Sequence, residues 1–143
     1  ILHNLGNSYN NEFQLKPERV IMDEALSNYR QSLKVYKKFG SPSEVAQKRW
    51  VIAKAFERLQ MFDSAASQLQ TGINQLIDNT KLIEASELPS IQPTLNDLKL
   101  IALVALKGRI YWLKFNQYKK IDDLKIAYRH FIFCLNFYQY LIK

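Results

Sequence analysis

VIAKAFERLQMFDSAASQLQTGI, residues 51–73, has the pattern of two short helices joined by a turn near residues 60–62. The apolar positions that recur at helical spacing on the two sides of the turn are Ala53, Phe56, Ala65, Leu69 and Gly72. Small and large side chains alternate among them. Antiparallel helices that approach closely need this alternation, because a small side chain on one helix must accept a large one from the other. The stretch therefore predicts a tightly packed helix–turn–helix unit.

The same pattern occurs once before this stretch and once after it. The matches to its first helix are Leu5–Tyr9 and, near the end of the chain, Gly108 and Tyr111. The matches to its second helix are Ala25, Tyr29, Ser32, Ala127, Phe131 and Cys134.

The spacing within these units differs. Corresponding small residues lie 19 positions apart in the first unit (Gly6 to Ala25) and in the third (Gly108 to Ala127), but only 12 apart in the middle unit. We therefore expect the first and third units to carry the same seven-residue extension between their helices.

These units resemble the tetratricopeptide repeat, the helix–turn–helix unit of α-solenoids. The longer units, with their DEAL-like and DLKIA-like helix starts, are similar to the variant repeats of large bacterial, especially cyanobacterial, proteins. The resemblance implies an all-α fold: a right-handed α-solenoid of about three antiparallel helix pairs, over residues 1–40, 43–80 and 94–142. We expect residues 1–143 to form one such domain, as a fragment of a longer protein, because the apolar run 131–142 supplies no polar capping helix.

Local signals divide the chain into helices. Pro17 favours a helix start, Gly40 ends that helix, and residues 41–44 read as an N-cap for the next. Asp63 is expected to cap the helix after the turn, and the pair at 122–123 to open the last helix. The expected helices cover residues 1–11, 18–39, 44–60, 63–80, 94–115 and 122–142. Residues 79–93 are expected to be irregular, and residues 116–121 to form a turn.

Composition limits the class of protein. The chain has 143 residues, of which 48% are hydrophobic, with four Gly and four Pro, so it can bury a core and is not a disordered segment. Its one cysteine, Cys134, excludes an intramolecular disulfide and fits a reducing compartment, which predicts a cytoplasmic location. The most apolar stretch, 98–113, contains three basic residues, so no membrane span is expected.

The net charge of +7 is concentrated at one end. Residues 98–143 hold nine Lys and Arg against two acids. Such a segment attracts an acidic partner, a nucleic acid or an anionic membrane, and it also fits a solvated face beside an acidic neighbour.

A candidate binding groove follows from the resemblance. In tetratricopeptide domains the first helices of successive repeats line a concave surface that binds a peptide. The residues that match this surface are His3, Asn7, Asn10, Gln47, Trp50, Lys54, Glu57, Arg58, Arg109 and Trp112. Asn can hydrogen-bond a peptide backbone, Arg can pair with carboxylates and Trp supplies apolar area. The alternative is that both tryptophans pack between helices.

Some members of the family clamp a C-terminal carboxylate on this surface. Asn7 matches one clamp position, but His3 stands where a Lys is usual. Val51, Ala102 and Leu106 occupy the remaining clamp positions and cannot hold a carboxylate. A carboxylate clamp is therefore not expected.

Catalytic and metal-binding patterns are weak. Cys134 and His130 form an i, i+4 pair, the spacing of a nucleophile and its base, but Cys134 occupies a small-residue position where a buried thiol packs as a hydrophobe. No run of residues has the spacing of a metal or nucleotide site. We expect no enzyme activity and no cofactor.

The sequence thus predicts a protein–protein interaction scaffold that binds a peptide or a partner domain, with self-association through the apolar last helix as a further option. One alternative is the sensor or regulatory arm of a larger bacterial effector. Another is nucleic-acid binding, with bases stacking on Tyr111 or Trp112. The phosphate contacts would then be Arg109, Lys114, Lys119, Lys120, Lys125 and Arg129.

Overall fold

The computed structural model describes residues 19–77, Leu88 and residues 98–142, with only the backbone of residues 140–141. The five helices of this part are α2 (Arg19–Phe39), α3 (Pro42–Arg58), α4 (Phe62–Leu76), α5 (Leu98–Tyr118) and α6 (Ile121–Ile142). The described residues contain no strand, so the all-α prediction is confirmed. The expected helix over 1–11 and the irregular segment 79–93, apart from Leu88, lie outside the described residues.

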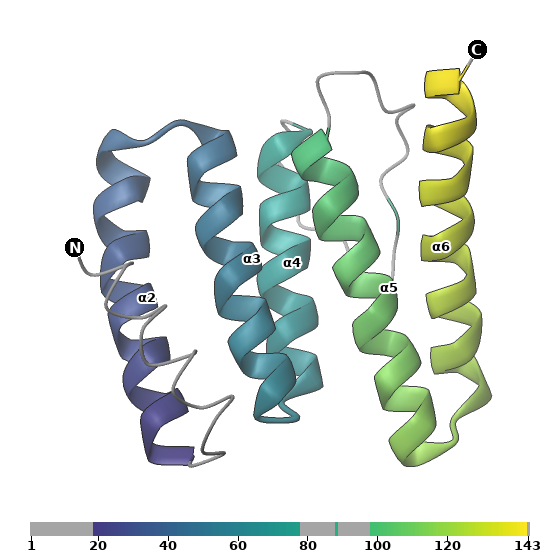
Figure 1. Cartoon of the computed structure of the whole chain (residues 1–143), viewed down its shortest axis with the longest axis horizontal. Coiled ribbons are helices and arrows are strands. Elements are labelled where there is room, and N and C mark those ends of the chain that lie inside the picture. The colour runs from purple at the N-terminus through teal and green to yellow at the C-terminus, as the bar shows by residue number, and fades with distance from the viewer. Residues whose placement is uncertain (1–18, 78–87, 89–97, 143) are drawn as a thin grey trace.

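The helices stand side by side, with successive helices running in opposite directions (Figure 1). α3 and α4 form one hairpin, and α5 and α6 form a second. α4 packs against both α3 and α5, which also touch each other, and α2 packs against α3. The core is therefore continuous from α2 to α6.

The start of α3 follows the sequence signals. Ser41 is its N-cap, and its side chain accepts a hydrogen bond from the backbone of Glu44, whose carboxylate accepts one from the backbone of Ser41 in return. This capping box satisfies two backbone N–H groups that the helix leaves open. Gly40 ends α2 at a position where a Cβ would lie 2.8 Å from the carbonyl oxygen of Tyr36.

Two expected boundaries are wrong. Asp63 does not cap α4: the N-cap is Met61, without a side-chain hydrogen bond, and the Asp63 carboxylate pairs with Lys114 of α5 at 2.8 Å. Residues 116–118 do not belong to the last turn but continue α5 to Tyr118, so that only residues 119–120 separate α5 from α6.

The seven-residue extension of the third unit also lies elsewhere than expected. α5 continues ten residues past Gly108, whereas α3 continues five past Ala53. Ala127 is the seventh residue of α6, whereas Ala65 is the fourth of α4. The extra residues therefore lengthen both helices of the second hairpin by about one turn each and are not inserted between them.

Small residues set the distance between helices, as the first stretch predicted. Ala53, Phe56, Ala65, Leu69 and Gly72 are all buried. A Cβ added to Gly108 of α5 would lie 2.9 Å from both Cβ of His130 and Cε1 of Phe131 in α6. These two helices approach closely because α5 has no side chain at this point.

Candidate interaction surface

Two polar bridges join α3 to α5 on one face of the array. The Lys99 Nζ of α5 donates to Gln47 Oε1 of α3 over 2.9 Å. Farther along the same helices, Arg109 Nε donates to Glu57 Oε1 over 3.1 Å in an ion pair. The partners of each bridge are 52 residues apart in sequence, so the packing of the hairpins brings them together.

Trp50 and Lys54 lie between these bridges along α3. Trp50 is partly buried against the core, and Lys54 Nζ lies 5.8 Å from the centroid of its ring. A cation at this distance is attracted to the negative face of the ring. On α5, Trp112 is 45% exposed and lies one turn beyond Arg109. We call the whole set the α3–α5 face: Gln47, Trp50, Lys54, Glu57, Lys99, Arg109 and Trp112.

The α3–α5 face is shallow and positively charged. A hollow of about 10 Å³ lies between the two helices beside Trp50, the size of a site for a single water molecule. Lys54, Lys99 and Arg109 outnumber the one acid of the set, Glu57. The face is suited to a segment of polypeptide laid across it rather than to an enclosed small molecule.

The other predicted groove residues are placed differently. Arg58 is half-buried and lies near Tyr29 of α2, where its charge opposes the effect of burial, which raises the pKa of Tyr29 to about 12. Arg58 therefore belongs to the α2–α3 contact. His3, Asn7 and Asn10 lie outside the described residues. The structure thus brings together six of the ten predicted residues and adds Lys99, which the resemblance did not mark.

The basic residues proposed for nucleic-acid contact do not form one surface. Arg109 pairs with Glu57, and Lys114 pairs with Asp63 at 2.8 Å and with Asp123 at 3.9 Å. Tyr111 is buried, with its ring stacked 6.1 Å from that of His130. The remaining exposed cations lie on the α5–α6 turn and the first half of α6: Lys119, Lys120, Lys125 and Arg129.

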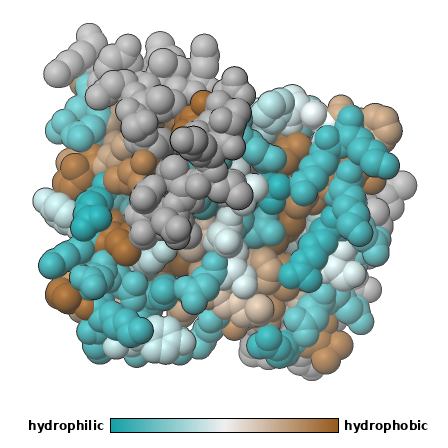
Figure 2. Space-filling model, turned by 180° about the vertical axis from the view of Figure 1, so that it is seen from behind, coloured by the Kyte–Doolittle hydropathy of each residue, from teal (hydrophilic) through white to brown (hydrophobic). Residues whose placement is uncertain are grey.

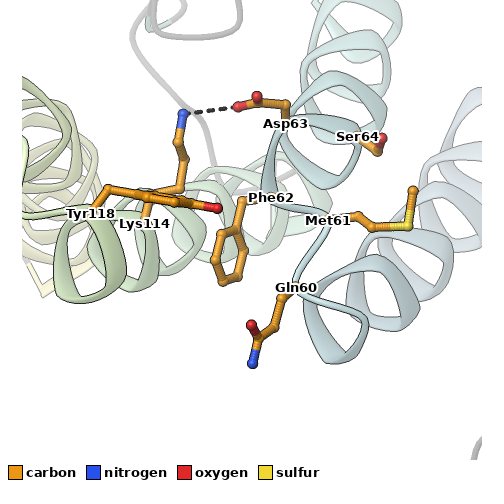
Figure 3. Close-up of a pocket in the computed structure, with 7 residues that line it drawn as sticks. All are labelled: Gln60, Met61, Phe62, Asp63, Ser64, Lys114 and Tyr118. Carbon is orange, nitrogen blue, oxygen red and sulfur yellow. Dashed lines mark hydrogen bonds and ion pairs between the residues drawn. The ribbon is translucent and has the colours of Figure 1, made fainter. Parts of the chain in front are cut away.

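Lys114 also lines the hollow drawn in Figure 3, which lies between the α3–α4 turn and α5. Burial lowers the pKa of Lys114, but the hydrogen bond to Asp63 and the charge of Asp123 outweigh it, and the pKa is raised overall. The ammonium is therefore held charged between two carboxylates. These contacts join α4, α5 and α6, which indicates a structural role for the cluster.

The Cys134–His130 pair is buried on the inner face of α6. Burial raises the pKa of the Cys134 thiol to about 11, so that it stays protonated at neutral pH. Burial and the charge of Lys107 lower the pKa of His130 to about 4, and its Nδ1 lies 2.7 Å from the carbonyl oxygen of Ile126. The pair lacks the accessible thiolate that nucleophilic catalysis requires.

Sequence reasoning missed two buried basic residues. Arg49 of α3 donates to Gln75 Oε1 over 3.2 Å and to Gln68 Oε1 over 2.8 Å, both on α4. Lys107 of α5 is fully buried and donates to the side chain of Gln70. Both occupy positions of the apolar helical period, and that placement was the available signal.

Comparison with known proteins finds no family model, no curated protein and no solved structure that matches this chain. Among the residues that the structure describes, no three His, Cys, Asp or Glu side chains are grouped to hold a metal ion. Nor is any helix of the described ranges long and apolar enough to span a membrane.

Proposed function

We propose that the chain is an α-solenoid adapter of the tetratricopeptide kind, and that its α3–α5 face binds an acidic segment of a partner protein. The observation that carries this proposal is the alignment of Trp50 and Lys54 between two bridges that fix α3 against α5. A face held rigid in this way loses little conformational entropy on binding. The proposal places the adapter in the cytoplasm, in keeping with its single unpaired cysteine.

Each part of the face has a defined task. The half-buried ring of Trp50 offers apolar area that is already immobilised, which is typical of a binding hot spot. Lys54 and Lys99 have no carboxylate partner among the described residues and supply charge for acidic side chains. The Glu57–Arg109 pair leaves the Arg109 side chain 56% exposed, so its guanidinium retains donors for a second carboxylate.

Tryptophan fluorescence tests the proposal directly, because both tryptophans of the chain lie on this face. The probe is an extended peptide of alternating Glu and Leu with a central Phe, and its comparison is the analogue with Gln in place of Glu. We expect the acidic peptide to change the emission with saturation. A Trp112→Phe variant should retain the change, because Trp50 lies between the bridges.

Charge reversal locates the site. Lys54→Glu should weaken binding of the acidic peptide by about tenfold or more, because like charges then meet across the contact. Lys34→Glu is the matched control: it makes the same change in net charge on the exposed surface of α2. Equal losses in the two variants, or equal binding of the Gln analogue, would contradict a site on the α3–α5 face. Preferential, steeply salt-dependent binding of single-stranded RNA would instead favour the cations around the α5–α6 turn.

A further inference from the structure

α6 carries a second apolar stripe beside its inner face, and the described helices leave most of this stripe exposed, although the ring of its member Phe131 also lies against Gly108 of α5. We call it the α6 seam. Its members, which lie at successive intervals of four, three, four, three and four residues, are Leu124, Tyr128, Phe131, Leu135, Tyr138 and Ile142. Leu124 is half-buried, and the other five are 64%, 43%, 50%, 52% and 84% exposed in that order. The inner face of the same helix is distinct from the seam and is formed by Ala127, His130, Cys134 and Phe137, which are buried.

The spacing of the seam specifies the kind of partner. Alternating intervals of three and four are the a and d positions of a heptad, the pattern by which one helix packs against another. A peptide strand or a flat sheet would not match a stripe of this period. Along the edge of the molecule where α6 lies, at the left of Figure 2, hydrophobic residues interrupt the hydrophilic surface.

The seam is large enough to support association. Aromatic side chains bury about 150–250 Å² each when covered, and Leu and Ile bury somewhat less, so the exposed fractions of the seam residues leave on the order of 100 Å² apiece. The sum, about 500–600 Å², is at the upper end of the largest apolar patch on a typical monomer. With its polar flanks it approaches the roughly 800 Å² per partner of a stable interface.

We propose that α6 pairs in antiparallel orientation with α6 of a second copy of this chain. The seam is complementary to itself when reversed. Leu124 of one copy then lies opposite Ile142 of the other, Tyr128 opposite Tyr138, and Phe131 opposite Leu135. Every d position meets an a position, and the two-fold axis passes near Phe133. A single patch that matches its own reverse is the requirement for a closed, two-fold dimer.

The charges on α6 favour the antiparallel orientation. Lys125 and Arg129 lie exposed beside the first half of the seam, and the second half has the uncharged Asn136 and Gln139 at the corresponding positions. In antiparallel pairing Lys125 faces Gln139, and the basic ends of the two helices are separated by roughly 20 Å, beyond the screening length of about 8 Å in physiological salt. In parallel pairing the basic first halves of both helices would lie at the same end of the dimer.

This inference concerns α6 alone and does not depend on the peptide-binding proposal. Sedimentation of the whole chain over a range of concentrations tests it. We expect a monomer–dimer equilibrium, and Leu135→Glu should weaken dimerisation by about a hundredfold or more, because it places two carboxylates in the apolar centre. Asn136→Glu is the matched control: it adds the same charge at an exposed position next to the seam, and should leave the dimer intact.

Leu135 is half exposed, so thermal unfolding of the Leu135→Glu variant at low concentration should match that of the dilute wild type, which establishes that the variant folds. A chain that stays monomeric at all concentrations, or equal losses with Leu135→Glu and Asn136→Glu, would overturn the proposal. A Tyr128→Glu variant provides an independent check at the next layer of the seam, because it should also dissociate the dimer.

The orientation has its own test at Gln139. Gln139→Glu should tighten the dimer several-fold, because the carboxylate faces Lys125 of the second copy, and Gln139→Lys should weaken it by a similar factor. In parallel pairing residue 139 would lie 14 residues, or roughly 20 Å, along the helix from Lys125 of the second copy. Similar effects of both substitutions would therefore overturn the antiparallel arrangement.

Discussion

The two hairpins of this molecule have turns of similar backbone conformation but differ in their surroundings. Each turn includes a non-glycine residue in the left-handed region, Gln60 with φ 58° before α4 and Lys119 with φ 57° before α6. The α3–α4 hairpin is enclosed by α2 on one side and α5 on the other. The α5–α6 hairpin has one described side covered and one side bare. Helices with similar apolar patterns are thus covered by other helices on both sides in the first hairpin and, among the described residues, on one side in the second.

Their interiors also differ in how they hold polar groups. In the first hairpin the Arg49 guanidinium is buried but donates to two glutamine oxygens. In the second, His130 is fully buried beside the charge of Lys107, and its Nε2 accepts no hydrogen bond from the described residues. Arg49 keeps its charge at any ordinary pH, whereas His130, whose pKa is lowered from 6.5 to about 4 by burial and by the charge of Lys107, gains a proton on unfolding when the pH lies between these two values. Acid should therefore act on the second hairpin first.

The largest predicted effect follows from this difference. The pKa of His130 is about 4 in the folded chain against 6.5 when unfolded, because burial and then the Lys107 charge disfavour the proton, with Arg129 adding a minor effect. Between these values the unfolded chain binds more protons, so stability present above pH 6.5 is lost as the pH falls toward 4. The full loss is about 3 kcal/mol, measurable by urea unfolding at a series of pH values.

His130→Asn isolates the contribution of this group. The amide can still donate to the carbonyl of Ile126, but it does not titrate. The free energy of unfolding of this variant should change much less between pH 6.5 and 5 than that of the wild type, a window in which few carboxylates titrate. Identical pH profiles for the two proteins would show that His130 is not the group responsible.

Local signals explain what the sequence predicted well. The Ser41–Glu44 capping box and the buried face of residues 53–72 depend on neighbours three or four positions away, so they can be read from the chain alone. The bridges from Gln47 to Lys99 and from Glu57 to Arg109 depend on how two hairpins pack. The resemblance marked three of these four residues, but no pattern in the sequence could have paired them.

The errors have equally specific causes. The turn expected over residues 116–121 is too long, because residues 116–118 form the exposed end of α5, where polar residues are compatible with a helix. The actual turn is set by the backbone of Lys119, a residue with no turn preference. Lys107 appeared only as an interruption of an apolar stretch, because its burial depends on a hydrogen bond to Gln70 of another helix.

Two glycines at helix contacts, Gly108 and Gly72, differ in how freely their neighbours can move. A Cβ at Gly108 would lie 2.9 Å from the Cβ of His130, which is fixed to its backbone, whereas a Cβ at Gly72 would lie 3.0 Å from a terminal methyl group of Leu103. Overpacking costs about 1–3 kcal/mol, and a helical Gly→Ala change returns about 1 kcal/mol. Gly108→Ala should therefore lower the free energy of unfolding by up to about 2 kcal/mol, and Gly72→Ala should change it little.

Chemical unfolding of the two variants at neutral pH measures this gap. Equal stability of the two alanine variants would mean that α6 can move away from α5 at no cost, and that the second hairpin is not rigidly packed. A larger loss at Gly72 would reverse the comparison and locate the tighter interface between α4 and α5.

The smallest effect tests what the two turns share. A non-glycine residue in the left-handed region costs about 1–2 kcal/mol, and glycine avoids this cost but loses more entropy on folding, so a change to Gly should gain about 0.5–1 kcal/mol. Gln60→Gly should show this gain in the free energy of unfolding.

Lys119→Gly should stabilise the fold less, because it also removes an ammonium that lies 5.6 Å from the centroid of the Phe115 ring, a contact worth about 0.5–1 kcal/mol at an exposed site. Lys119→Asn, which tolerates the same backbone conformation and also lacks the ammonium, is the control for the lost contact. Equal gains at both turns would show that the Phe115 contact contributes nothing, and destabilisation by Gln60→Gly would contradict the left-handed conformation on which the comparison of the turns depends.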